Sequence, residues 1–256
     1  MSFTVEYVEY MLLILARIGT MIYIVPFFGH TDIPRKAKLF TAFFLSLIVL
    51  NMIGYEPLSY DGMLGYSILI VKEGLTGLLI GMGAGVSMYI LSFSGHTIDM
   101  EIGFAMAMEM DPTTRVQTTI SSTIFTTIFM LYFLASDMHY FLLDALFDSY
   151  KLIPVGKAVF NPLLYNVYLE YMVDYFVIGF RIILPVFACI LTVNVILGIL
   201  AKVAPQLNMF VVGMQVKVFI GLFLLFILMG LMPGIVDFLF DEMQKLTKLF
   251  VQGIAP

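Results

Sequence analysis

Apolar residues run along this chain in long blocks that are separated by short polar connections. Six of these blocks approach the roughly 20 residues that a helix needs to cross the hydrocarbon core of a bilayer. Pro34, Pro57 and Pro205 stand in the connections, where proline interrupts helical hydrogen bonding. The predicted helical blocks are Tyr7–Phe28, Ala37–Ile53, Gly62–Phe93, Ile120–Ala135, Tyr171–Leu200 and Met209–Val236.

The blocks are continuous rather than alternating. A membrane β-barrel would alternate apolar and polar residues, and only helices and closed barrels satisfy their backbone groups in lipid. The sequence therefore predicts an all-α integral membrane protein with about six hydrophobic helices.

One further segment, Asp137–Leu152, is amphipathic. Its polar residues Asp137, Asp144, Asp148 and Lys151 recur at intervals of seven, four and three, which places them on one helical stripe. Its opposite face is predicted to carry Phe141, Leu142, Ala145 and Leu152. We expect an interfacial helix, or one that packs against a partner, rather than a spanning helix.

Composition narrows the class of protein further. Hydrophobic residues make up 61% of the 256 residues, and the 12% of charged residues is about half the fraction usual in soluble domains. The 13 basic and 18 acidic residues give a net charge of −5, which offers nucleic acid no electrostatic footprint. The single cysteine, Cys189, excludes a disulfide framework. A soluble enzyme and a nucleic-acid binder are both disfavoured.

Six charged residues lie inside the apolar blocks, three or more residues from either end. Each costs about 2.5–3.5 kcal/mol at the centre of a membrane helix, so they cannot all face lipid. One interpretation is snorkelling near helix ends together with structural pairing inside the bundle. The other is a hydrated pathway or a subunit interface. The six residues are Arg17, Lys72, Glu73, Asp174, Arg181 and Lys217.

Gly77, Gly81 and Gly85 recur every four residues in the third block. Missing side chains at this spacing let two helices approach closely, and we expect plain helix packing here. A nucleotide-binding glycine loop is excluded because no strand precedes the segment.

The sequence contains no recognisable catalytic motif. It has no His-Glu-x-x-His, no Gly-x-Ser-x-Gly and no phosphate-binding loop. Its three histidines, His30, His96 and His139, fall in separate loops or at loop edges. We therefore expect no enzyme activity, no cofactor and no metal site.

The connection Gly95–Thr119 is rich in methionine and contains an Asp-Pro turn at Asp111 and Pro112. Methionine is unbranched and adaptable, so it fills irregular space and repacks after displacement. Two interpretations stay open from the residues alone: an ordinary loop with core contacts, or a deformable seal inside a pore.

Motifs along nearly the whole chain match a known family. The most specific is the run Val203–Gly213, in which Pro205 cannot continue a helix, Asn208 can cap the next one and Gln206 adds a polar group. On these motifs the sequence resembles the FliR family of flagellar export-gate proteins, which has counterparts in injectisomes. The other matching positions are Arg17, Pro26, Ile33–Lys38, Gly77, Gly81, Gly103, Asp111 with Pro112, and Leu152–Gly156.

The resemblance implies a noncatalytic subunit of the type III export apparatus in the bacterial inner membrane, at the flagellar basal body. It implies assembly with FliP and FliQ into a closed helical cone that conducts unfolded export substrates, alongside FlhB and FlhA. Residues 1–165 would be FliP-like and residues 166–256 FliQ-like, with tilted helical hairpins.

The resemblance also implies roles for individual residues. The segment Gly103–Gln117 would be the plug of the pore, and the signature turn would lie at Pro205, Gln206, Asn208 and Gly213. The charges in the apolar blocks would become subunit contacts, although Lys217 does not match the family pattern. The expected plug residues are Gly103, Phe104, Met106, Met108, Met110, Asp111, Pro112 and Arg115.

Two alternatives remain. One is a small-solute secondary transporter with a midplane site at Asp174, Arg181 and Lys72, although transporters usually carry an internal repeat and none is evident. The other is the equivalent gate subunit of a virulence injectisome.

Overall fold

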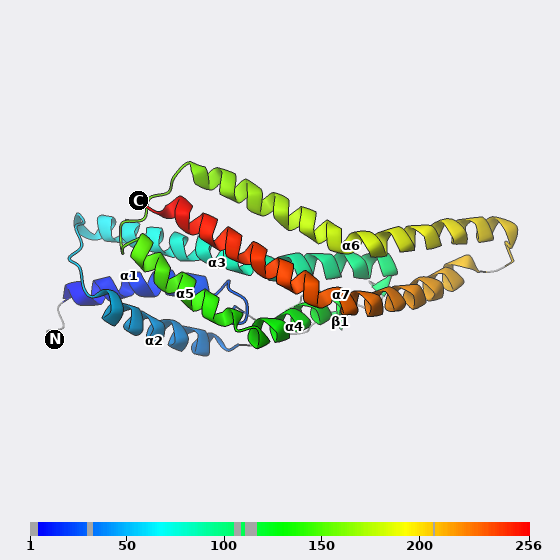
Figure 1. Cartoon of the computed structure of the whole chain (residues 1–256), viewed down its shortest axis with the longest axis horizontal. Helices are drawn as coiled ribbons and strands as arrows, with labels where there is room; N and C mark the ends of the chain where they lie inside the picture. Colours follow the sequence, from blue (N-terminus) through cyan, green and yellow to red (C-terminus); the bar gives the residue numbers. More distant parts are fainter. Residues whose placement is uncertain (1–4, 30–32, 105–108, 111–116, 207) are drawn as a thin grey trace. The chain divides into compact units, whose positions relative to one another are not determined.

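A computed structural model describes residues 5–29, 33–104, 109–110, 117–206 and 208–256. Within these ranges the chain forms seven helices and one two-stranded antiparallel ladder, in which Glu109 lies opposite Thr118 and Met110 opposite Gln117 (Figure 1). The all-α class is confirmed. The elements are α1 Val5–Ile22, α2 Arg35–Ile53, α3 Gly62–Ile102, β1 Glu109–Met110, β2 Gln117–Thr118, α4 Ile120–Ala135, α5 Met138–Leu152, α6 Leu163–Val203 and α7 Met209–Ile254.

Four of the described helices have the length and composition of membrane spans by themselves, whereas α1 and α4, both predicted as hydrophobic blocks, do not. Among the described residues, α2, α3, α6 and α7 are each long and apolar enough to cross a bilayer, and the bent pair α4–α5 raises the number to five. Helices α3 and α6 have 41 residues and α7 has 46, so each is about twice the length that the hydrocarbon core requires. A helical membrane protein is confirmed.

Four predicted boundaries were wrong. Helix α6 begins at Leu163 rather than at the predicted Tyr171. Helix α1 ends at Ile22 rather than Phe28, because a compact turn follows in which Phe27 adopts a φ of 69°. Helix α7 continues from the predicted end at Val236 to Ile254. Helix α3 continues to Ile102, so the first eight residues of the predicted Gly95–Thr119 connection are helical, and Gly103 ends the helix with a φ of 95°.

The chain divides into two compact units. Unit 1 comprises residues 1–87, 133–171 and 240–256, and unit 2 comprises residues 88–132 and 172–239. Helices α3, α4, α6 and α7 contribute segments to both units. The predicted division at residue 165 concerned likeness to sister subunits rather than compactness, and it stays a prediction.

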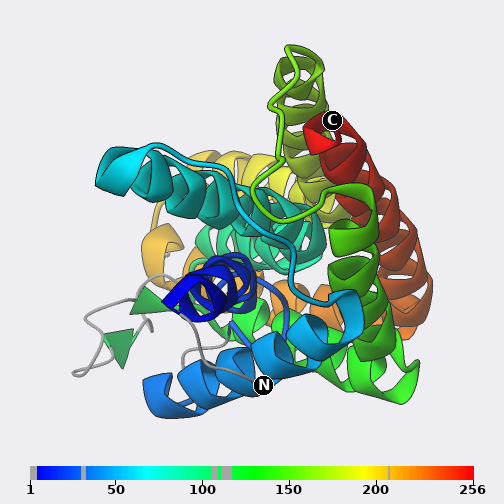
Figure 2. The ribbon, with the colours of Figure 1, turned by 90° about the vertical axis from the view of Figure 1, so that its left-hand side faces the viewer.

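In unit 1, α1 lies between α2 and α3 (Figures 1 and 2). Its side chains Leu13, Ile14 and Ile18 are fully buried. Helices α1 and α2 are antiparallel, because Tyr55 after α2 donates a hydrogen bond to Glu6 at the start of α1.

Helix α5, also in unit 1, is amphipathic as predicted. Asp137, Asp144, Asp148 and Lys151 are all exposed, and the Lys151 ammonium lies 2.8 Å from the Asp148 carboxylate. The predicted apolar face was wrong at one position, because Leu152 is 53% exposed at the end of the helix. The buried side chains of the helix are Leu142, Leu146, Ser149 and Tyr150.

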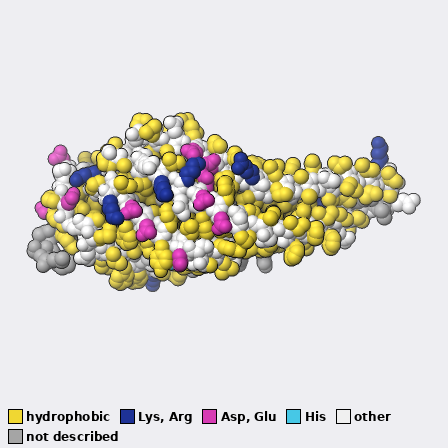
Figure 3. Space-filling model, in the orientation of Figure 1, with side chains coloured by type: hydrophobic (Ala, Val, Ile, Leu, Met, Phe, Trp, Pro, Cys, Tyr) yellow, Lys and Arg dark blue, Asp and Glu magenta, His cyan; other side chains and the backbone are white. Residues whose placement is uncertain are grey.

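In unit 2, the segments of α6 and α7 that flank their shared turn form an antiparallel hairpin. Gly213 of α7 lies against Leu197 of α6, where an added Cβ would be 3.2 Å from a leucine methyl group. Many large apolar side chains point outward from this hairpin, and Phe219 and Phe226 are each more than 70% exposed. Figure 3 shows hydrophobic side chains covering most of the hairpin on the face in view. This surface needs lipid or neighbouring helices to cover it.

Candidate functional site

The centre of unit 1 contains a bidentate ion pair. Arg17 of α1 donates to Glu73 of α3 through Nε to Oε2 at 2.6 Å and through Nη2 to Oε1 at 3.0 Å. Both side chains are fully buried. A planar guanidinium matches a carboxylate in this paired geometry, which makes the contact both strong and directional.

The remaining polar atoms of the pair are bound by the end of α5 and the loop after it. Arg17 Nη1 donates to the carbonyl oxygens of Ser149 at 3.3 Å and Ile153 at 3.0 Å. The backbone N–H of Gly156 donates to Glu73 Oε1 at 2.8 Å. A cation at the C-terminus of a helix is favoured by the helix dipole. Arg17 therefore stabilises the C-terminal end of α5 in addition to binding the Glu73 carboxylate.

Tyr150 of α5 closes the cluster on one side. The Arg17 guanidinium lies 4.2 Å from the centre of the Tyr150 ring, and the Tyr150 hydroxyl donates to the Ile14 carbonyl at 3.1 Å. Three helices and one loop therefore meet at a single saturated cluster. Such a cluster fixes the packing of these elements against one another.

The other predicted charges of the apolar blocks are in different environments. Lys72 is half-buried on the neighbouring face of α3 and forms no ion pair with the described residues. Asp174 and Lys217 are half-buried in unit 2, and Arg181 is exposed there. The role of these four residues in assembly stays a prediction.

The glycines of α3 lie where other helices cross it. An added Cβ at Gly77 would be 2.0 Å from the Arg17 carbonyl oxygen, and at Gly81 it would be 3.2 Å from the Met21 carbonyl oxygen. Gly83 faces α7 instead, where a Cβ would be 2.8 Å from the Thr247 Cα. Gly85 is buried. Close approach at Gly77 brings α1 near enough for Arg17 to reach Glu73, one turn away on α3.

Most of the predicted plug lies outside the described residues. Gly103 and Phe104 are described and half-buried, and Met110 contributes backbone to β1. The other plug candidates, Met106, Met108, Asp111, Pro112 and Arg115, are among the residues not described. Their role stays a prediction.

The two ends of this connection are joined by a contact that the sequence interpretation missed. Asp99, in the last turn of α3, is fully buried and accepts hydrogen bonds from Ser121 at the start of α4. The Ser121 N–H donates to Oδ2 at 3.0 Å, and the Ser121 hydroxyl donates to Oδ1. A carboxylate here satisfies an otherwise unpaired N–H and complements the positive end of the α4 dipole.

Glycine makes that contact possible. Gly95 lies one turn before Asp99, and an added Cβ there would be 2.3 Å from the Ser122 backbone nitrogen. The sequence did contain a signal for this contact. An acidic residue, Asp99, lies near the end of one apolar block, and two serines, Ser121 and Ser122, lie at the start of the next. Serine at a helix start marks a cap, but the carboxylate that caps α4 comes from another helix.

The signature turn lies between α6 and α7. Asn208 directly precedes α7. Its carbonyl oxygen accepts from Val211 and Val212, each at 3.1 Å, and its side-chain oxygen accepts from Val211 at 3.5 Å. Pro205, Gln206 and Asn208 are exposed, whereas Gly213 is buried against Leu197. A contact with a partner at this exposed turn stays a prediction.

No metal chemistry is supported in the part of the chain that the structure describes. Those residues contain no group of three or more His, Cys, Asp and Glu side chains that could hold a metal ion.

The architecture defines a helical membrane protein. It has a buried ion-pair cluster, a long helical hairpin, and a connection between α3 and α4 whose two ends are held together by the Asp99–Ser121 hydrogen bonds. Its sequence matches the family of bacterial export proteins, family 1, over residues 8–243, and the chain belongs to this family. It is similar to the flagellar biosynthetic protein FliR of Bacillus subtilis, with 31% identity over 234 residues and 90% coverage of each chain. The protein of the same name from Aquifex aeolicus is 28% identical over 248 residues, covering 97% of this chain and 96% of that one. The Escherichia coli protein of that name is 24% identical over 232 residues, covering 91% and 88%.

Proposed function

We propose that this chain is a subunit of the flagellar type III export gate, which forms with FliP and FliQ the pore for unfolded flagellar substrates. The observation that carries the proposal is similarity over about nine tenths of the chain to proteins named flagellar biosynthetic protein FliR. In this role the chain is noncatalytic and resides in the bacterial inner membrane at the flagellar basal body.

The surface of the chain supports an assembled state. The hairpin of α6 and α7 exposes large apolar side chains on many sides, and a hairpin inside a helical cone would cover these with neighbouring subunits. Arg181 and the half-buried Lys217 supply charges for such contacts. Residues 1–165 would take the place of a FliP-like subunit and residues 166–256 that of a FliQ-like one, with FlhB and FlhA as further partners.

The plug belongs to the same proposal. A conduit wide enough for an unfolded chain leaks ions unless something closes it at rest. We assign that task to Gly103–Gln117, with Phe104, Met106, Met108 and Met110 as the seal, because thioether side chains repack at low cost. The Asp99–Ser121 contact would hold both ends of the segment in place while its middle moves.

Copurification tests the assembly. The tagged chain is expressed with FliP and FliQ of the same bacterium, and the membrane complex is isolated in mild detergent. We expect the three proteins in one stable particle, and we expect the chain to restore motility to a strain that lacks its own FliR. Recovery of the tagged chain alone, with uptake of a small solute after reconstitution, would instead favour the transporter alternative. Restoration of virulence-protein secretion without motility would favour an injectisome gate.

A further inference from the structure

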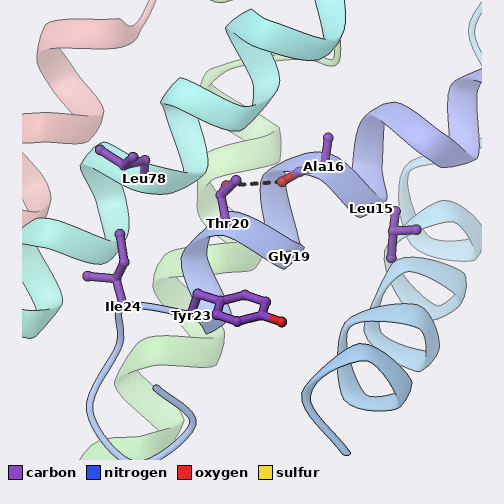
Figure 4. Close-up of a pocket in the computed structure, with 7 residues that line it drawn as sticks. All are labelled: Leu15, Ala16, Gly19, Thr20, Tyr23, Ile24 and Leu78. Atoms are coloured by element: carbon purple, nitrogen blue, oxygen red, sulfur yellow. Dashed lines mark hydrogen bonds between the residues drawn. The ribbon is translucent and has the colours of Figure 1, made fainter. Parts of the chain in front are cut away.

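An apolar groove of about 420 Å³ lies on unit 1 beside α1 (Figure 4). Six of its residues come from α1 and the turn after it, and Leu78 comes from α3. The groove is open to the surface. Its lining residues are Leu15, Ala16, Gly19, Thr20, Tyr23, Ile24 and Leu78.

Gly19 of α1 lies in the wall of the groove. An added Cβ at Gly19 would meet nothing within 4 Å, so the missing side chain leaves open space rather than a helix contact. The one hydroxyl of the α1 lining, that of Thr20, donates to the Ala16 and Arg17 carbonyl oxygens at 3.0 Å each. The walls therefore present hydrocarbon, and water in the groove gains few hydrogen bonds.

One end of the groove lies next to a cluster of cations. Tyr23 lines the groove, and the Lys38 ammonium of α2 lies 5.4 Å from the centre of its ring while donating to the Gly29 carbonyl at 2.9 Å. Arg35 is one turn from Lys38 on α2, and both Arg35 and Lys36 are exposed. The start of α2 thus carries three cations, of which Lys38 is the one placed beside Tyr23, and one acidic residue, Asp32, precedes them in the sequence.

These cations occupy an unfavourable position for helix stability. They lie in the first turn and a half of α2, which has no acidic residue in its first turn and no side-chain cap. The N-terminus of a helix carries partial positive charge, so cations there are repelled and an anion is attracted. An external anion would offset this repulsion.

The opposite end of the α1–α2 pair has the opposite charge. Tyr55 donates to Glu6 and Tyr60 donates to Glu9, and the second hydrogen bond raises the pKa of Tyr60 to about 12 because it favours the neutral phenol. Glu56 lies at the same end, 3.3 Å from Lys157. An anionic ligand is therefore complementary to the Arg35 end alone.

We propose that this groove binds an anionic phospholipid of the membrane. One acyl chain lies along the groove over Gly19, and the phosphate and headgroup lie against Arg35 and Lys36. The groove has the volume of a small-ligand pocket and an alkyl chain fits it, whereas a helix of 10–12 Å diameter does not. The charge complementarity selects an anionic headgroup over a zwitterionic one. This site is independent of the proposed role in export.

The test compares two lipids that differ only in the headgroup. The purified full chain in mild detergent is titrated with palmitoyl-oleoyl phosphatidylglycerol or palmitoyl-oleoyl phosphatidylcholine, and bound lipid is counted by native mass spectrometry. Wild type should retain phosphatidylglycerol preferentially. Arg35→Gln with Lys36→Gln should weaken phosphatidylglycerol binding roughly 30-fold, at about fivefold for each charge near a membrane surface, and remove the preference.

Two further variants separate the tail from the headgroup. Gly19→Leu fills the groove without touching the basic residues, and it should weaken the binding of both lipids. Lys151→Gln with Lys157→Gln removes the same charge from exposed positions elsewhere in unit 1 and should change neither. The Arg35/Lys36 variant should also keep the wild-type unfolding temperature, because removing cations from a helix N-terminus does not destabilise it.

Three outcomes would overturn the proposal. The first is equal retention of the two lipids by wild type. The second is unchanged phosphatidylglycerol binding in either the Gly19→Leu or the Arg35/Lys36 variant. The third is a complex with partner subunits that forms normally and excludes phosphatidylglycerol, while Gly19→Leu abolishes that complex, because the groove would then be a subunit contact.

Discussion

Arg17 on α1 and Glu73 on α3 face each other across a distance of 2.6 Å between Nε and Oε2, and neither side chain has any exposed surface. The pair is 56 residues apart in sequence and also binds the end of α5. Two charges that are costly in an apolar interior are tolerated because each satisfies the other and nearby backbone groups satisfy the rest. The cluster thereby fixes how α1, α3 and α5 pack in unit 1.

Glu73→Ala should destabilise unit 1 strongly. It leaves the Arg17 guanidinium buried without its carboxylate, and breaking a buried pair in this way costs roughly 3–5 kcal/mol. Thermal unfolding of the purified chain, followed by circular dichroism in detergent, measures the loss. Lys157→Gln is the matched control, since its ion pair with Glu56 is exposed and worth about 1 kcal/mol or less. Equal unfolding temperatures for the two variants would show that the buried pair contributes little.

Gly77→Ala should also destabilise the chain, for a steric reason. The added methyl group would lie 2.0 Å from the Arg17 carbonyl oxygen, so α1 and α3 must separate. Overpacking of this kind typically costs about 1–3 kcal/mol. Gly198→Ala in α6 is the control: its Cβ meets nothing within 4 Å, and alanine favours a helix by roughly 0.5–1 kcal/mol over glycine. The two variants should shift the unfolding temperature in opposite directions, and a Gly77→Ala protein as stable as wild type would contradict the close packing.

Asp99→Ala should loosen the start of α4 without unfolding the chain. The Ser121 N–H and hydroxyl lose their acceptor, and loss of a helix cap costs about 0.5–2 kcal/mol. Hydrogen exchange should quicken at the first-turn amides of α4, while amides in the middle of α1 keep their protection. Ser121→Ala keeps the backbone donor and should have a smaller effect. Unchanged exchange in Asp99→Ala would mean that another group caps α4.

The sequence was sufficient to predict the helices, because long apolar blocks in a membrane protein leave the backbone few alternatives to a helix. It placed Arg17 and Glu73 in apolar surroundings but not opposite each other. That partnership depends on Gly77 bringing two helices together, and helix spacing is a property of the folded packing. The end of α3 was missed for a related reason. Gly95 interrupts the apolar pattern and so looks like the end of a helix, but it lies inside α3. Glycine is needed at this position because the α4 backbone packs where a side chain would be.

The role of Asp99 could not be predicted because it depends on a residue that is distant in the sequence. Its carboxylate looks like an ordinary polar residue at the edge of a loop, and its role appears only when α4 begins beside it in space. The charge of Arg181 was conspicuous in the sequence, and in the folded chain the residue is exposed, so its role in assembly stays a prediction. A contact between subunits forms only in the complex, so neither the sequence nor the fold of one chain identifies the partner residue.

The turn between α6 and α7 offers a test of partner contact. Asn208 caps α7 mainly through its backbone carbonyl, so Gln206→Ala with Asn208→Ala should cost the isolated chain about 1 kcal/mol or less. If the exposed turn contacts a partner, the yield of the complex with FliP and FliQ should fall far more than this loss predicts. A wild-type yield of complex from the double variant would show that the segment is a turn and nothing more.

Deletion of Met106–Met110 should make the assembled gate leak. The segment is the methionine-rich middle of the proposed plug. The helices that flank the plug, α3 and α4, are joined through Asp99 and Ser121. Because that contact survives the deletion, α3 and α4 should keep their places and the complex should still assemble. Cells that express the deletion variant with FliP and FliQ should then take up small ions or solutes faster than cells with the wild-type gate, while export need not stop.

The matched variant replaces Met106, Met108 and Met110 with leucine, which keeps the apolar bulk and reduces the adaptability of the side chains. If a deformable seal is what closes the pore, this variant should leak less than the deletion and more than wild type, because branched leucines refill an irregular opening less completely than thioethers. An assembled deletion variant that is no leakier than wild type would remove the segment from the role of plug. Its methionines would then be interpreted as ordinary packing residues, and the closure of the gate would have to come from other subunits.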